Sequence, residues 1–185
     1  MPNQGPYSGK DIPDDAECLR LLNTLGVGSK ITAHCLATAE VAWRLALALN
    51  NLGAGLDAPL IRAAALLHDL AKGRPNHARE GARILEELGL PRVAAAMASH
   101  PDLEFPDNAP LSEAELVYLA DKLVQGDRIV SLEERFSTKL AHVGSTAESR
   151  ARMEGRLARA RRSLARVEAA LGGPVADVLS GAGSR

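Results

Sequence analysis

The sequence predicts an all-α protein, a helical bundle with an additional long C-terminal helix. Hydrophobic residues make up 46% of the 185 residues, whereas aromatic residues make up only 3%. A core of this composition consists mainly of Leu, Ala, Val and Ile, whose side chains let helices pack closely. Successive segments also place apolar residues at spacings of three and four, which is the pattern of a helix with one buried face.

Composition divides the chain into four segments. Residues 1–13 are rich in Pro, Gly, Asn and Ser and are predicted to be a flexible N-terminal segment. Residues 14–140 are predicted to form one domain, because a chain of this length has a core large enough to fold alone. Residues 141–171 are predicted to hold a linker and the long helix, and residues 172–185 a flexible tail.

Start and stop signals define the helices of the domain. Acidic residues open the first, Asp57 and Pro59 open the third, and the capping box Ser112-Glu113-Ala114-Glu115 opens the sixth. Glycine or proline separates most of them. The helices are expected at about residues 14–25, 30–50, 57–71, 78–88, 91–100 and 112–123, with a short helix or turn over Ser131–Phe136.

The long C-terminal helix, at about residues 147–171, carries apolar residues at alternating spacings of four and three. We expect this stripe either to pack back on the domain or to pair with another subunit in a homo-oligomer. Seven arginines against three glutamates make the helix basic and leave room for an acidic partner.

The overall charge and the cysteines exclude several classes. A formal charge of −1 gives no general signal for nucleic-acid or membrane binding. Cys18 and Cys35 do not make a disulfide framework or a Cys-x-x-Cys metal motif. No signal peptide or apolar span of membrane length is visible, so a cytoplasmic protein is expected.

The functional centre of the sequence is the pair His68-Asp69, at the end of the apolar run Ala63-Ala64-Ala65-Leu66-Leu67. Burying an imidazole beside a carboxylate costs free energy unless something pairs with them. A divalent metal ion is the simplest partner, because both groups are common ligands.

Other histidines and an aspartate complete this centre. His34 alone is more often a hydrogen-bonded core residue than a ligand, but the downstream pair reverses that preference. His77 and His100 are expected at helix–loop junctions, and Asp121 lies among apolar residues, where it needs a partner. The candidate metal ligands are His34, His68, Asp69, His77, His100 and Asp121. His142 fits no ligand pattern and is predicted to be a surface histidine.

This order, H…HD…H…H…D, resembles the HD-domain superfamily of metal-dependent phosphohydrolases, from about Cys18 to Phe136. The resemblance implies that His77 and His100 are the additional histidines of the dinuclear branch. Within the superfamily the chain looks most like HD-type hydrolases of diadenosine tetraphosphate and their uncharacterised relatives. The loop after His100, Pro-Asp-Leu-Glu-Phe-Pro, differs from the sequence expected in those hydrolases.

Six ligands are more than one metal ion with an open position uses. Two divalent transition-metal ions about 3.5–4 Å apart, bridged by Asp69 and a water, are therefore predicted. Fe, Mn, Co, Ni and Zn all suit this set of ligands. Asp69, Lys72 and Arg128 are the predicted catalytic residues, with both cations contacting phosphate. The structural alternatives are a solvated helix end for Lys72 and a salt bridge for Arg128.

The predicted function is a metal-dependent phosphohydrolase or phosphodiesterase that uses a metal-activated water. Its expected substrate is a small phosphorylated molecule, with a nucleotide as the first choice. One alternative is an HD-fold di-iron oxygenase. The other is a catalytically silent regulatory or interaction module. Metal content, phosphate release and oxygen consumption distinguish the three.

Overall fold

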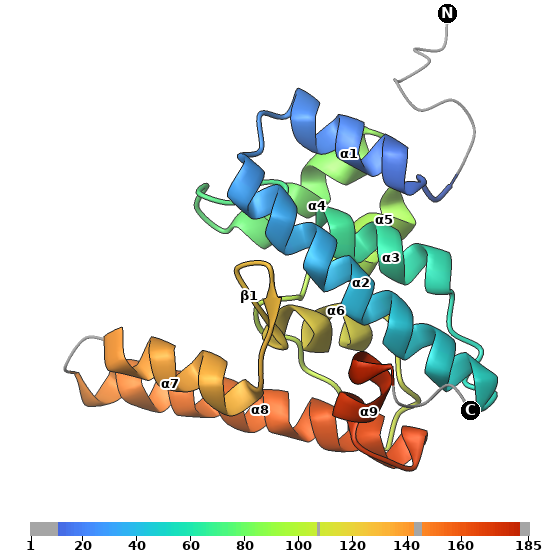
Figure 1. The fold of residues 1–185 in the computed structure, drawn as a ribbon. Coiled ribbons are helices and arrows are strands. Elements are labelled where there is room, and N and C mark those ends of the chain that lie inside the picture. Colours follow the sequence, from blue (N-terminus) through green and yellow to red (C-terminus); the bar gives the residue numbers. More distant parts are fainter. Residues whose placement is uncertain (1–10, 107, 143–145, 182–185) are drawn as a thin grey trace, which may run out of the picture.

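The computed structural model describes residues 11–106, 108–142 and 146–181. Within these ranges the chain is helical apart from its loops and one short hairpin, so the predicted all-α fold is confirmed (Figure 1). The elements are α1 (Asp15–Thr24), α2 (Ser29–Asn51), α3 (Ala58–Leu67), α4 (His77–Glu87), α5 (Pro91–Met97), α6 (Glu113–Lys122), β1 (Val124–Gln125), β2 (Arg128–Ile129), α7 (Leu132–His142), α8 (Ala147–Leu171) and α9 (Val175–Ser180).

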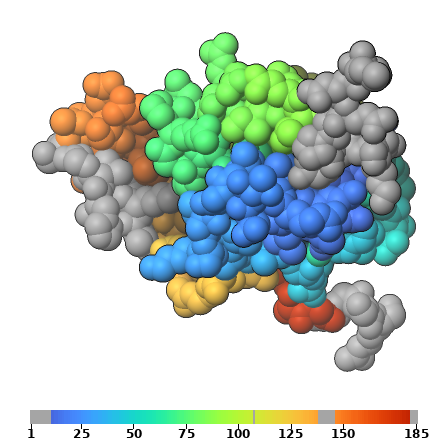
Figure 2. Space-filling view, turned by 90° about the horizontal axis from the view of Figure 1, so that it is seen from above, coloured from blue at the N-terminus to red at the C-terminus, as the bar shows by residue number. Residues whose placement is uncertain are grey.

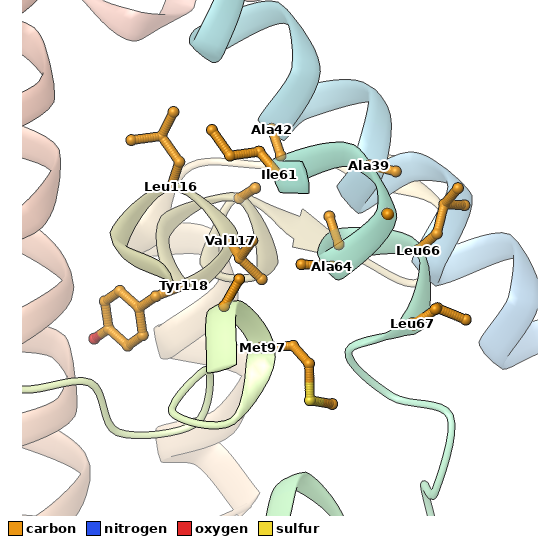
Figure 3. Close-up of a cluster of buried hydrophobic side chains, with 14 of the residues drawn as sticks. Ala39, Ala42, Ile61, Ala64, Leu66, Leu67, Met97, Leu116, Val117 and Tyr118 are labelled. Carbon is orange, nitrogen blue, oxygen red and sulfur yellow. The ribbon is translucent and has the colours of Figure 1, made fainter. Parts of the chain in front are cut away.

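The core lies where α3 packs between α2, α5 and α6. Ala42 of α2, Ile61 and Ala64 of α3 and Val117 of α6 belong to one buried cluster (Figure 3). Small side chains let the helix backbones approach closely, whereas Met97 of α5 adds a longer, flexible side chain. The ends of these packed helices carry the polar residues described below.

Several predicted helix starts are confirmed by their caps. Asp14 and Glu17 form a reciprocal capping box at α1, with hydrogen bonds of 2.9 and 2.8 Å. Asp57 accepts a hydrogen bond from the backbone N–H of Leu60 at the start of α3, and Ser112 accepts one from the backbone N–H of Glu115 at the start of α6. The Glu115 side chain binds Arg166 and does not complete the predicted capping box. These caps satisfy backbone donors that have no partner within the helix.

The long helix α8 packs back on its own chain. It runs antiparallel to α7 (Figure 1), also contacts α6, and buries Ala160, Ser163 and Val167. Its arginines pair largely with acidic groups of the same chain: Arg156 and Arg159 bind Asp102. These intrachain ion pairs neutralise part of the positive charge of the helix.

The predicted tail is wrong in part, because residues 175–180 form α9. Val175 is buried, and Nη1 of Arg44 on α2 donates to the carbonyl of Leu179 at 2.7 Å. This short helix is stabilised by contacts with α8, which directly precedes it, and with α2, which is distant in sequence. Residues 182–185 lie outside the described part of the chain.

Three smaller differences concern the ends of elements. Ile12 and Pro13 pack at the start of the domain, whereas residues 1–10 of the predicted flexible segment lie outside the described residues. The helix α7 reaches His142, within the segment predicted as linker. A hairpin follows α6, because Gly126 adopts a φ of 63° that suits a tight turn.

No helix in the described ranges is both long and apolar enough to cross a membrane.

Candidate metal centre

Five segments of the bundle bring the six predicted ligands together. His34 lies in α2, and Asp121 lies near the end of α6. His68 and Asp69 directly follow α3, and His77 is the first residue of α4. His100 follows α5. The predicted convergence of helix ends is therefore present.

Three histidines are oriented by backbone carbonyls. Nδ1 of His34 lies 2.8 Å from the Gly126 carbonyl oxygen. Nδ1 of His68 lies 2.7 Å from that of Ala65, and Nδ1 of His100 lies 2.9 Å from that of Met97. A carbonyl oxygen only accepts hydrogen bonds, so Nδ1 carries the proton and the neutral ring keeps a lone pair on Nε2.

Local structure explains two of these contacts. His68 and His100 each bond to the carbonyl three residues earlier, in the last turn of α3 and α5 respectively. Carbonyls in the last turn of a helix lack a partner within it, so they are free to accept from a side chain. Both rings are thereby fixed with Nε2 directed away from the helix end.

The carboxylate of Asp69 connects two groups of possible ligands. Its Oδ1 lies 3.3 Å from Nε2 of His77 and 3.5 Å from Nε2 of His100. Its Oδ2 lies 3.6 Å from Nε2 of His68. His34, His68 and Asp69 form one compact group, and Asp69, His77 and His100 form the other. The two groups share Asp69.

Asp121 borders the first group. Its Oδ1 lies 3.2 Å from Nε2 of His34 and 3.8 Å from Nε2 of His68. It also receives hydrogen bonds from Arg135 at 3.0 Å and from Lys122 at 2.6 Å. A buried carboxylate is thus stabilised by cations and remains adjacent to two imidazoles.

The geometry fits bound metal ions. Nε2 of His68 is buried and has no hydrogen-bond partner among the described residues. A buried nitrogen of this kind is costly unless a ligand binds it. Two ligands about 2.1 Å from one ion lie about 3.0–3.4 Å apart. The nitrogen–oxygen distances here run from 3.2 to 3.8 Å, so small side-chain shifts bring them into range.

The protonation states also suit metal binding. Burial lowers the pKa of His68 from 6.5 to about 4, against the opposing charge of Asp69. Burial also lowers the pKa of His77. Burial disfavours the ionised form of Asp69, but His100 and Lys72 outweigh this effect and hold its pKa below the usual range. Neutral imidazole and ionised carboxylate are the forms that bind metals.

A cavity of about 170 Å³ lies directly over the ligands and is lined by His77, His100 and Asp121. Phe136 and Met153 form its apolar part. Four cationic side chains also line it: Lys72, Lys122, Arg135 and Arg156. This concentration of positive charge beside the ligands favours an anionic molecule in the cavity.

The two predicted phosphate contacts have different positions. Lys72 lines the cavity, and its Nζ lies 2.9 Å from Oδ2 of Asp69. Arg128 is not brought to the cavity: its side chain is 73% exposed and lies 3.8 Å from Glu134. Arg128 belongs to β2, and the hairpin places its side chain on the surface. Its position beside Glu134 matches the structural alternative, a salt bridge.

Three of the cationic residues that line the cavity were not predicted: Lys122, Arg135 and Arg156. Lys122 directly follows the predicted ligand Asp121, and this position in the sequence could have indicated that it lies at the site. Arg135 and Arg156 belong to α7 and α8, and no signal in the sequence indicated that these two side chains face the cavity. The side chain of His142 lies outside the described part of the chain.

Comparison with known proteins agrees with this geometry. The sequence model of the HD domain matches residues 31–125. The chain belongs to the HD domain family. The match ends at Gln125, so Arg135, Phe136, Met153 and Arg156 come from a C-terminal extension of the HD domain. The extension therefore supplies one wall of the cavity.

Three relatives show different amounts of overlap. The uncharacterised protein MJ0778 of Methanocaldococcus jannaschii is 33% identical over 64% of this chain and 79% of its own length. A tRNA (cytidine(56)-2'-O)-methyltransferase of Picrophilus torridus is 30% identical over 68% of this chain and 40% of its own length. Ribonuclease Y of Thermus thermophilus is 37% identical over 58% of this chain and 19% of its own length. No solved structure gives a significant match.

Proposed function

We propose that this HD protein is a metal-dependent phosphohydrolase or phosphodiesterase that acts on a small phosphorylated substrate, with a nucleotide as the expected class. One observation supports this most strongly. Two groups of His and Asp residues share Asp69 beneath a cavity lined by four cationic side chains. Ligands for divalent cations and donors for an anion thus occur in one site.

The proposal assigns each ligand a role. His34, His68 and Asp121 would hold one divalent ion and His77 and His100 a second, with Asp69 available to both. Fe, Mn, Co, Ni and Zn all suit imidazole and carboxylate ligands. Bound ions lower the pKa of water and neutralise charge on phosphoryl oxygens.

The cations around the cavity bind the substrate phosphate in this proposal. Nε of Arg135 is buried and has no hydrogen-bond partner in the described ranges, so it is available to an anion. Lys72 is 48% exposed, and its Nζ is directed at Asp69 from the solvent side. Hydrogen bonds from charged donors to phosphate are strong, and they stabilise the charge of the transition state.

The overall reaction is hydrolysis of a phosphorus–oxygen bond. The oxygen of water becomes bonded to phosphorus, and the bond to the leaving oxygen breaks. One proton of the water is transferred to the leaving oxygen, and the other stays with the phosphate product. The residues of the chain orient the phosphate and hold the catalytic ions.

The relatives do not by themselves assign a substrate to this chain. Ribonuclease Y is by its name an enzyme that acts on RNA, and this chain matches 19% of its length. The methyltransferase is by its name a different kind of enzyme, and this chain matches 40% of its length. The substrate assignment here therefore rests on the cavity and its charges.

A hydrolysis screen tests the proposal. Metal-loaded protein is incubated with nucleoside mono-, di- and triphosphates and short oligonucleotides, and released phosphate and nucleoside are measured beside the Asp69→Ala variant. We expect metal-dependent release that the variant lacks. Oxygen uptake without phosphate release would instead identify the oxygenase. Metal binding with neither activity would identify the silent module.

A further inference from the structure

A second hollow adjoins the cavity of about 170 Å³ over the candidate metal ligands, which we call the inner cavity. It has a volume of about 600 Å³, and three residues line both spaces: His77, Pro101 and Arg156. In Figure 2 the orange surface of the α7–α8 end lies beside the green surface of α4. The hollow is lined by the start of α4, the segment that follows α5, and Arg156 of α8. We call it the outer hollow.

The inner cavity alone is smaller than the pockets that usually enclose a small-molecule ligand. Pockets that enclose small-molecule ligands usually have volumes of about 300–1,000 Å³. The inner cavity measures about 170 Å³, whereas the outer hollow measures about 600 Å³. A substrate whose phosphate occupies the inner cavity therefore extends into the outer hollow.

The outer hollow has an excess of positive charge. Arg79 of α4 lines it and has no ion pair or hydrogen bond with any described residue. Arg156 lines it from α8 and binds Asp102 at 2.8 Å. Asp102 also lines the hollow and binds Arg159 at 2.7 Å, and Arg159 has a second carboxylate partner in Glu104. The charge of Arg79 is left without a partner.

The hollow offers little to a nucleobase. No Phe, Tyr or Trp is among the described residues that line it, and its one imidazole, His77, is a candidate metal ligand, so it offers little surface for stacking. Asn76 and Ser99 add polar groups at its edge. Its lining therefore matches a phosphate better than a base.

We propose that the outer hollow binds a second phosphate group of the substrate through Arg79 and Arg156. This inference rests on the proposed function, because it assumes that the scissile phosphate lies over the metal ligands. The substrate class is a nucleotide with two phosphates, either adjacent as in a nucleoside diphosphate or separated by a nucleoside as in a 5′-phosphorylated dinucleotide. Recognition does not depend on the base.

Equilibrium binding tests the subsite independently of catalysis. The probes are AMP, ADP, pApA and pUpU, titrated calorimetrically into metal-loaded full-length protein kept at low temperature to limit turnover. The variant Arg79→Ala removes the proposed contact. The variant Arg83→Ala is a matched control on the same helix, because Arg83 pairs with Glu80 at 2.9 Å and does not line the outer hollow.

We expect wild type and Arg83→Ala to bind ADP or pApA on the order of tenfold more tightly than AMP, and Arg79→Ala to lose that preference. If only ADP binds more tightly than AMP, the substrate has two adjacent phosphates. If only pApA binds more tightly than AMP, the substrate is an oligonucleotide whose two phosphates are separated by a nucleoside. Equal binding of pUpU and pApA is expected in the second case. Equal affinities in wild type and Arg79→Ala for all probes would overturn the subsite.

Failure of the proposed function gives a different result. If the two-phosphate preference depends on Arg79 but no probe is hydrolysed at working temperature, the subsite stands and the hydrolase is refuted. If AMP, ADP and pApA are all hydrolysed with the same KM in wild type and Arg79→Ala, the hydrolase stands and the subsite is refuted.

Discussion

Oδ1 of Asp69 lies 3.3 Å from Nε2 of His77, while its other oxygen faces His68 at 3.6 Å. One carboxylate thus faces imidazoles from both sides of the centre. This arrangement makes the two groups of ligands separable by mutation, because each group also has histidines of its own.

Replacing His77 or His34 is expected to remove one ion each. The side chains are partly exposed, at 26% and 14%, so His77→Ala and His34→Ala are expected to fold. Elemental analysis is expected to give about one ion per chain in either variant and about two in wild type. Loss of both ions in both variants would show that the groups are not separate sites.

The pH dependence of stability is expected to report His68 in metal-free protein. Its folded pKa is about 4 and its unfolded value 6.5, so between these values the unfolded chain binds a proton that the folded chain does not. The free energy of unfolding therefore falls as the pH drops through this window, by about 1–3 kcal/mol from this residue.

Urea unfolding of chelated protein between pH 7 and pH 4 measures this contribution. The His68→Gln variant lacks the titrating ring and serves as the comparison, since other groups titrate equally in both proteins. A smaller pH dependence is expected in His68→Gln. The same slope in both proteins would contradict the assignment.

Arg135 and Arg128 provide a matched pair for phosphate binding. Arg135 lines the cavity, whereas Arg128 is exposed on the hairpin. With metal content checked as equal, Arg135→Met is expected to lower kcat/KM for a phosphate ester by about tenfold to a hundredfold. Arg128→Met is expected to leave it unchanged, and equal losses would argue against the cavity as the phosphate site.

The short helix α9 is expected to stabilise the domain. Val175 is 3% exposed, and its neighbour Ala176 is on the surface. The change Val175→Asp buries an unpaired charge and is expected to lower the free energy of unfolding by about 2–4 kcal/mol. Ala176→Asp is expected to have little effect, and circular dichroism during urea unfolding compares them. Similar midpoints for the two variants would mean that α9 is not docked.

The cluster of candidate metal ligands was predictable because its residue types are unusual where they occur. A histidine and an aspartate after a run such as Ala63-Ala64-Ala65-Leu66-Leu67 need a partner, and caps such as Ser112 fix the helix starts locally. The order of these residues also carries the family resemblance. Local signals were sufficient for this part of the site.

The missed features depend on contacts between distant segments. Arg135 reaches the cavity because α7 packs on α8 and its guanidinium donates to Asp121 of α6, and α9 forms because Val175 and Leu179 pack near α2. Arg128 is close in sequence to Asp121, but the turn at Gly126 directs it to the surface. Closeness to Asp121 in the sequence therefore did not place Arg128 at the cavity, because the turn sets the direction of the hairpin.

The most direct test of the account is the metal content of the full chain, purified without chelator, beside the Asp69→Ala variant. Because Asp69 contacts both groups of ligands, about two transition-metal ions per chain are expected in wild type and none in the variant. Two ions retained by Asp69→Ala, or no metal bound by wild type even after reconstitution, would contradict a dinuclear centre built on this carboxylate.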